Sequence, residues 1–591
     1  MKLKKYMIDK DARLAPYLEA IPEIVRYQAA TKVILGIWLF LLGRLFRLLL
    51  NSTGRVAVTS GDFTFIFTTW QGILIILIAL ASLFVYVSLD LNAKIILSRN
   101  LLLEENVSVW RSCMEALNCI SRFLSIEGIG ILIYIVLIAP LLGIGFSISL
   151  TKGFYIPTFI SSVIGDTPLY LILSSMAVIV FIATGIGNLF MMHGIIIDKL
   201  PIKEAGRQSQ KIIRENWKDY LWQNIVFILV MAAVLGIVIL VFLVLPLFLT
   251  DILPLEEKLK RGLTVFFMLE GTLMSLITDL VAIPFYIMKM TQLYFTYRDN
   301  KVFSYQGREV KLRKLDQYGL IAVAAGVIVV TVFMSSNFDR IFPLESQVKI
   351  IAHRGGGAEG AENTVSGLEK AWSIGAYGSE IDIQRTKDGH YILNHDGNFA
   401  RVAGDKRKPE DMTLEEIRKL SVDGEPIPTL EEILEASKGK MILFIELKGN
   451  TADQQMADDT VRIVKEYGME DETVLISLKY ELIDYIETKY PEMQTGFLTF
   501  ASFGDTALLN CDYLALEEES ATADSIAAVH KQGKKVLIWT ANKKGSQRYF
   551  LCSSADAVIT DNVTQATEVL NEIHNRSDIR RIIDRIKEFI G

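Results

Sequence analysis

The sequence predicts two unlike domains: an all-α domain that crosses a membrane several times, followed by an α/β domain that folds as a (β/α)8 barrel. Long apolar runs occupy the first 340 residues, whereas from residue 346 short β-rich runs alternate with helical patterns. The composition is also mixed, because 51% of the 591 residues are hydrophobic while 22% are charged, the latter an ordinary globular value. The predicted divisions are a polytopic membrane domain over 1–340, a barrel over 346–575 and an amphipathic C-terminal helix over 576–591.

About seven apolar runs in the first domain are long enough to span a bilayer, which takes about 20 predominantly apolar residues. They are 31–50, 64–89, 126–149, 168–197, 221–249, 263–288 and 319–336. The first run contains Arg44 and Arg47, so a helix in the membrane interface is an alternative there.

The connections between these runs differ in positive charge. Segments 91–125, 198–220 and 291–318 carry 16 basic residues, against five in the alternate connections. Because basic loops stay in the cytoplasm, this bias predicts a multi-pass protein of the cell membrane with a cytoplasmic N-terminus. The barrel then lies outside the cytoplasm.

The second domain repeats a strand-and-helix unit eight times. The strand candidates are 348–352, 378–383, 441–447, 473–477, 494–499, 511–516, 535–540 and 556–560. Helical patterns follow at 364–374, 412–437, 452–467, 479–490, 502–509, 522–532, 546–553 and 564–574. Eight units in about 245 residues fit the size of a TIM barrel. The run HYILN (390–394) follows the turn signal TKDG and is predicted to pair back on the second strand as a hairpin.

Three carboxylates sit near the ends of predicted strands, where TIM-barrel active sites lie. Glu380 and Asp382 are two residues apart on the second strand, and Glu446 is near the end of the third. A lone carboxylate there would usually belong to an ion pair. Three that converge would repel one another without a cation, and oxygen ligands suit one divalent ion, Mg²⁺ or Ca²⁺, with Mn²⁺ as a further option.

Two of the six histidines also end predicted strands at this mouth, His353 after the first strand and His395 after the hairpin. Histidine suits acid–base chemistry near neutral pH, and Arg354 and Lys448 add positive charge that can hold a phosphate. Supporting or substrate-binding candidates are Glu362, which is also a candidate fourth metal ligand, Trp539 and Asn542. The set indicates phosphate-ester chemistry.

The motifs HRGGGAEGAENT, SEIDIQRTKDGHYILNHD, IPTLEEIL, FIELK, WTAN and VITDN occur in this order. Together they resemble the glycerophosphodiester phosphodiesterase family over about residues 349–570, and the first half is similar in layout to the membrane domain of some bacterial members. The resemblance implies a metal-dependent TIM barrel of the cell envelope that hydrolyses glycerophosphodiesters to glycerol 3-phosphate and an alcohol.

The resemblance also implies roles for individual residues. His353 and His395 match the catalytic histidines of the family. The metal ligands are matched by Glu380, Asp382 and Glu446, and the phosphate contacts by Arg354 and Lys448. The chain departs from the family pattern at Ala361, where the family usually has proline, and at Val563, where it often does. Neither change removes a reactive group.

Two alternatives stay open at this point. One is a phospholipase-like phosphodiesterase on the same barrel that forms a cyclic phosphate. The other is a non-catalytic membrane protein that only binds a phosphodiester. Substrate candidates are products of lipid head groups and the polyglycerol-phosphate chains of lipoteichoic acid. The net charge of -6 gives no indication of a nucleic-acid partner.

Overall fold

The computed structural model describes residues 15–59, 63–103, 108–125, 127–130, 165, 167–299, 313–500 and 502–590. The chain forms two compact units. The first comprises Met1–Arg44 and Leu74–Asn337, and the second comprises Leu45–Ile73 and Phe338–Gly591. The barrel unit therefore includes the connection between the first two predicted spans.

The first unit is helical, and six stretches of its described residues are long and apolar enough to cross a membrane. They are α1 (Ala15–Asn51), α3 (Trp70–Leu102), α7 (Pro168–Gly187) with α8 (Met191–Ile196), α9 (Ile202–Ile239) with α10 (Leu245–Ile252), α11 (Glu257–Asp299) and α12 (Lys314–Ser336). These coincide with six of the seven predicted spans. The other prediction, 126–149, lies outside the described residues except for 127–130.

The apolar surfaces of several of these helices are not covered by protein. In α7, α9–α10 and α12, none of the most apolar 18-residue stretch is buried. Exposing this much apolar surface to water costs free energy, so these helix surfaces are suited to contact with lipid.

A shorter helix, α4 (Val109–Ile120), follows α3 and is capped by Ser108, whose side chain accepts a hydrogen bond from the backbone N–H of Arg111.

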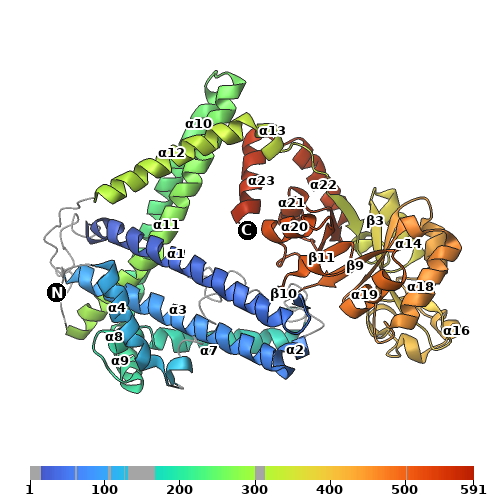
Figure 1. The fold of residues 1–591 in the computed structure, drawn as a ribbon, viewed down its shortest axis with the longest axis horizontal. Helices are drawn as coiled ribbons and strands as arrows, with labels where there is room; N and C mark the ends of the chain where they lie inside the picture. Colours follow the sequence, from blue (N-terminus) through green and yellow to red (C-terminus); the bar gives the residue numbers. More distant parts are fainter. Residues whose placement is uncertain are drawn as a thin grey trace. The chain divides into compact units, whose positions relative to one another are not determined.

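The barrel consists of eight parallel strands in one ring (Figure 1). They are β2 (Lys349–Ala352), β3 (Gly378–Arg385), β7 (Ile442–Leu447), β8 (Thr473–Ser477), β9 (Gln494–Thr499), β11 (Tyr513–Glu517), β12 (Lys535–Trp539) and β13 (Ala557–Thr560). Their order is β2-β13-β12-β11-β9-β8-β7-β3, and pairing of β2 with β3 closes the ring. All eight predicted strands are confirmed. The hairpin is confirmed too, since β4 (Tyr391–Leu393) pairs antiparallel with β3.

Two layers of apolar side chains hold the barrel together. The interior is filled by residues such as Ile351, Phe444 and Leu537, all at most 2% exposed. A second layer of apolar side chains lies between the strands and the helices that surround them. These helices are α14 (Val365–Ser373), α17 (Leu430–Ser437), α18 (Gln454–Tyr467), α19 (Tyr480–Lys489), α20 (Ala523–His530), α21 (Lys544–Leu551) and α22 (Val563–His574). The C-terminal helix α23 (Asp578–Ile590) packs on α21 and buries Ile582.

The predicted helix at 412–437 is wrong as one element. It divides into α16 (Leu414–Ile417), a small hairpin of β5 (Ser421–Val422) and β6 (Glu425–Pro426), and α17. The turn at Asp423 and Gly424 has positive φ at both residues, which a helix cannot contain. Thr429 then caps the N-terminus of α17 and forms a capping box with Glu432.

The predicted helix at 502–509 is also wrong. This segment forms a strand, β10 (Ser502–Gly504), followed by a single 3-10 turn, Thr506–Leu508. β10 pairs antiparallel with β1 (Ala57–Thr59), which lies between α1 and the short helix α2 (Phe63–Thr68). The partner strand lies more than 400 residues away in sequence, so local pattern could not predict it.

Candidate active site

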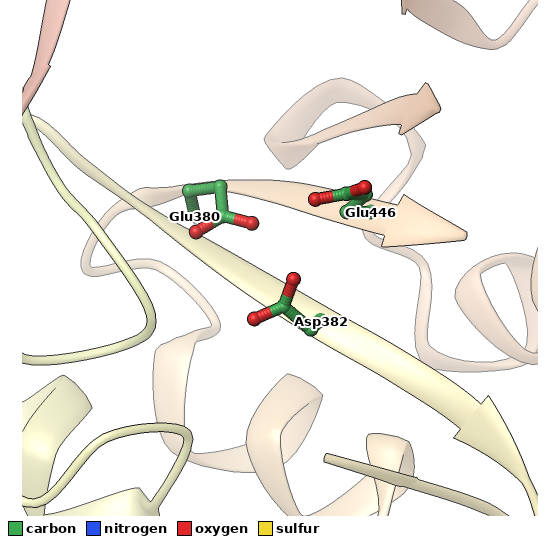
Figure 2. Close-up of side chains that lie close together, drawn as sticks. All are labelled: Glu380, Asp382 and Glu446. Atoms are coloured by element: carbon green, nitrogen blue, oxygen red, sulfur yellow. The ribbon is translucent and has the colours of Figure 1, made fainter. Parts of the chain in front are cut away.

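Three carboxylates converge at the mouth of the barrel (Figure 2). Glu380 and Asp382 share one face of β3, and Glu446 on β7 is the direct strand partner of Asp382. Their side chains turn toward one another, with one oxygen of each within 4.8 Å of the others, and all three are at most 6% exposed. This all-oxygen donor set fits a hard divalent cation. The crowding is visible in Glu380, where burial and the charge of Asp382 raise the pKa to about 8.

Lys448 supplies positive charge to this group. Its Nζ donates to Asp382 Oδ1 and to Glu446 Oε2, both at 2.9 Å. Burial would raise the pKa of Asp382, but the charges of Lys448 and His395 and the hydrogen bonds from Lys448 and Asn363 together hold that pKa well below its usual range. The structure thus places Lys448, predicted to contact phosphate, against two of the predicted metal ligands. Lys448 compensates one of the three negative charges of the cluster.

Asn363, which the sequence analysis did not single out, fixes the orientation of Asp382. Its Nδ2 donates to Asp382 Oδ2 at 2.9 Å, and its Oδ1 accepts from the backbone N–H of Asp382 at 3.1 Å. Asn363 has φ of 54°, a left-handed conformation that asparagine tolerates well. The next residue, Thr364, caps α14. The available signal was the Glu-Asn-Thr triplet just before a helix.

His353 lies between two acidic groups. Its Nδ1 is 2.6 Å from Oδ1 of Asp561, and its Nε2 is 3.9 Å from Oε2 of Glu380. Asp561 is held in turn by the side-chain amide of Asn542 at 2.5 Å. Burial lowers the pKa of His353, but the hydrogen bond to Asp561 and the charges of Glu380 and Asp561 raise it overall. Because a carboxylate only accepts hydrogen bonds, Nδ1 carries a proton and Nε2 faces the cluster.

Asp561 directly follows β13. Its position at the end of a predicted strand is the sequence feature that could have identified it as a site residue. The glycine-rich loop after β2 explains how His353 reaches it. Gly357 has φ of 64°, and a Cβ there would lie 2.3 Å from the carbonyl oxygen of Asp561. A side chain at Gly357 would therefore push the loop that carries His353 away from Asp561.

His395 has a similar partner in a different environment. Its Nδ1 is 2.8 Å from Oδ1 of Asp396, whose Oδ2 accepts from Nε of Arg401 at 2.7 Å. Burial lowers the pKa of His395 to about 4; the charge of Asp382 opposes this shift, while those of Lys448 and Arg354 add to it. At neutral pH this imidazole is uncharged and its Nε2 can accept a proton.

Arg354 and Glu362 lie beside the two histidines. The backbone N–H of Arg354 donates to Glu380 at 2.9 Å, and its Nη1 is 3.6 Å from Glu362 Oε2. Its Nε is buried without a hydrogen-bond partner, which fits a group that awaits an anion. Glu362 accepts two hydrogen bonds from Arg401, at 2.6 and 2.8 Å. It lies outside the group of three carboxylates that could hold a metal.

The remaining candidates lie at the ends of β11 and β12. Trp539 is half-buried, and its indole N–H donates to the carbonyl of Ala515 at 3.0 Å. The side-chain amide of Asn542 donates a hydrogen bond to Asp561, as described above. Glu517, which ends β11 and is 2% exposed, accepts from the backbone N–H of Glu519 at 3.1 Å. It is a further acidic group that the sequence analysis did not include.

Comparison with known proteins gives two family matches that together cover most of the chain. Residues 18–334 match the membrane domain of glycerophosphoryl diester phosphodiesterase, and residues 353–565 match the glycerophosphoryl diester phosphodiesterase family. The chain belongs to the glycerophosphoryl diester phosphodiesterase family. It is accordingly a membrane protein and a phosphodiester hydrolase, and the expectation from the motifs is confirmed.

Individual relatives match the barrel half. A glycerophosphodiester phosphodiesterase of Caldanaerobacter subterraneus is 29% identical over 231 residues, which cover 36% of this chain and 93% of the relative. One of Bacillus altitudinis is 24% identical and covers 38% of this chain and 99% of the relative. Among solved structures, an Oleispira antarctica phosphodiesterase in complex with the product sn-glycerol-3-phosphate is 23% identical and covers 38% of this chain and 96% of that one, with a TM-score of 0.36.

Proposed function

We propose that this enzyme hydrolyses glycerophosphodiesters to glycerol 3-phosphate and an alcohol, using one divalent ion and two histidines of opposite protonation state. The observation that carries the proposal is the arrangement around the carboxylates. Three buried carboxylates converge, and the two histidines near them have pKa values shifted in opposite directions. Groups whose pKa values are pushed apart are suited to act as an acid and a base.

Glu380, Asp382 and Glu446 are the proposed ligands of the ion, Mg²⁺ or Ca²⁺, with Mn²⁺ as a further option. Bound there, the ion would neutralise charge on the phosphate oxygens of the substrate. Arg354 would bind a phosphate oxygen through its unpartnered Nε. Lys448 is the second proposed phosphate contact. Glu362 positions Arg354 through their ion pair, and Arg401 positions Asp396 through its hydrogen bond.

The chemical step then needs two proton transfers. His395, uncharged at neutral pH, takes a proton from the attacking water through Nε2 as the new O–P bond forms. His353, kept protonated by Asp561, gives a proton from Nε2 to the departing alcohol as its P–O bond breaks. The two aspartates hold the Nδ1 protons throughout, so each imidazole presents the same nitrogen to the substrate.

The proposed topology places the N-terminus in the cytoplasm and the barrel outside it. The loop charges indicate which side is the cytoplasm. The β1–β10 pairing supports a barrel on the side opposite the N-terminus, because paired strands lie on the same side of the membrane and α1 is one candidate span. The number of crossings between residues 59 and 338 must then be even. The described residues contain five candidate spans in that stretch, and the predicted run at 126–149 would be the sixth. Protease added to intact cells should release the barrel without permeabilisation.

A panel of glycerophosphodiesters, assayed on the purified full-length protein, tests the activity. We expect glycerol 3-phosphate as product, loss of activity after exhaustive chelation, and recovery with Mg²⁺, Ca²⁺ or Mn²⁺. Glu446→Gln should lose activity, whereas Glu415→Gln, on a side chain 89% exposed, should not. Activity that survives chelation would refute the metal site. A released cyclic phosphate would instead favour the cyclising alternative.

A further inference from the structure

The connection between α1 and α3 is built into the barrel. β1 pairs with β10 in the register Ala57↔Gly504 to Thr59↔Ser502. All three residues of β1 are buried, at 6, 1 and 2% exposed, and the backbone N–H of Asp505 donates to the carbonyl of Val56 at 3.0 Å. The segment is therefore a packed part of the barrel unit and contacts it through both backbone and side chains.

The contact extends into the last turns of α1. Gly504 has φ of 109°, and a Cβ there would lie 2.6 Å from the carbonyl oxygen of Val56 and 3.2 Å from Cδ1 of Leu50. Leu50 is 1% exposed. One turn earlier, Nη1 of Arg47 is 3.3 Å from Oδ1 of Asp505. The absence of a side chain at position 504 thus allows the end of α1 and β1 to approach β10 closely.

β10 lies at the mouth of the barrel. It follows the carboxyl end of β9, and the carboxyl ends of the strands carry the candidate active site. In the closed ring, β9 is four strands from β2 in either direction, so β10 lies across the mouth from His353. The segment from α1 therefore reaches the part of the rim that lies opposite His353.

The same segment is tied to the bilayer at both ends. α1 ends at Asn51, α3 begins at Trp70, and both are candidate spans. Five residues lie between Asn51 and Ala57, so the distance from the end of α1 to β1 is at most about 20 Å. Phe67 and Trp70 are 70% and 65% exposed, and Leu508, next to β10, is 50% exposed. Aromatic residues at the ends of spans are typical of the membrane interface.

We propose that the β1–β10 pairing holds the mouth of the barrel at the bilayer surface, and that the substrate is a glycerophosphodiester attached to that surface by a lipid anchor. This inference rests on the proposed function. A substrate confined to the surface meets a mouth confined to the same surface, which raises its effective concentration. A soluble diester gains nothing from the pairing, because it reaches the mouth from any direction.

Two probes with the same glycerophosphodiester group separate these cases. One carries a dialkyl lipid anchor on its alcohol and is embedded in nanodiscs together with the full-length enzyme; the other has a short soluble alcohol. Gly504→Val should break the pairing by collision with Val56. We expect it to lower kcat/KM for the anchored probe at least tenfold and to leave the soluble probe within about twofold. Gly533→Val is the matched control, because Gly533 also has positive φ but nothing within 4 Å of its Cβ position.

Equal losses on both probes, or no loss on either, would overturn the inference. If the wild type hydrolyses the soluble probe and not the anchored one, the inference fails while the proposed function stands. If it hydrolyses neither with any divalent ion, the proposed function itself fails.

A disulfide provides a test that does not depend on a disruptive variant. The backbone N–H of Asp505 donates to the carbonyl of Val56. Hydrogen-bonded and non-hydrogen-bonded positions alternate along an antiparallel pair, so Thr59 and Ser502, three positions along, form a non-hydrogen-bonded pair with closer side chains. Thr59→Cys with Ser502→Cys should cross-link under oxidation and keep full activity on the anchored probe. A failure to cross-link, or a cross-linked enzyme that loses this activity, would contradict the inference.

Discussion

His353 and His395 both present Nδ1 to an aspartate, but the second partner of that aspartate differs between them. Asp561 has the neutral Asn542 as its other partner, so its full negative charge acts on His353. Asp396 also accepts a hydrogen bond from Arg401, whose positive charge partly compensates the negative charge that Asp396 presents to His395. The pKa of His353 is raised, and that of His395 is lowered to about 4. Burial and the charges of Lys448 and Arg354 lower the pKa of His395, and the second partner of the aspartate is a further difference between the two pairs that variants can test.

The largest expected effect comes from removing either imidazole. His353→Ala and His395→Ala should each lower kcat by roughly 10²–10⁴, the usual size of a general acid–base contribution. KM should change little, because the metal site and Arg354 still bind the phosphate. His390→Ala, at an exposed position on the hairpin, should match the wild type. A glycerophosphodiester assay in which either variant kept most of its kcat would refute the assigned chemistry.

The two candidate catalytic histidines could be predicted from sequence because each directly follows an apolar run whose pattern identifies a strand. The same logic found all eight strands, the hairpin and the three carboxylates. It could not assign partners to the histidines, because Asp561 is 208 residues from His353 and only the closed ring brings them together. It also missed β10, because Gly504 and its far partner Ala57 carry no local strand pattern.

Charge removal at Asp561 should have the next largest effect. Asp561→Asn keeps an oxygen that can face Nδ1 but removes the charge that raises the pKa of His353. Because the acid must be protonated, activity is lost as pH rises through this pKa, and the basic limb of kcat/KM against pH should move to lower pH. Above that limb, activity falls about tenfold for each pH unit of displacement.

The chain offers a matched control for this variant. His530 also pairs with an aspartate, but through Nε2, which is 2.9 Å from Oδ2 of Asp556. Asp556→Asn should leave the pH profile unchanged. A basic limb that stays in place in Asp561→Asn would show that Asp561 orients His353 without setting its protonation.

The smallest and most specific effect is expected at Arg401. Arg401→Gln should leave Asp396 ionised at neutral pH, because the pKa of Asp396 is about 2 in the wild type, far below neutrality, and Nδ1 of His395 still donates to its carboxylate. The uncompensated charge of Asp396 should then favour the cationic form of His395 and raise its pKa. A base works only when uncharged, so activity is lost as pH falls through this pKa, and the acidic limb of kcat/KM should move to higher pH while the basic limb stays.

Arg401 also binds Glu362, so Glu362→Gln serves as the control: it keeps Arg401 on Asp396 and should leave the acidic limb in place. If both variants moved the acidic limb equally, Arg401 would act through Glu362 and Arg354, and the contrast between the two aspartates would not explain the two histidines.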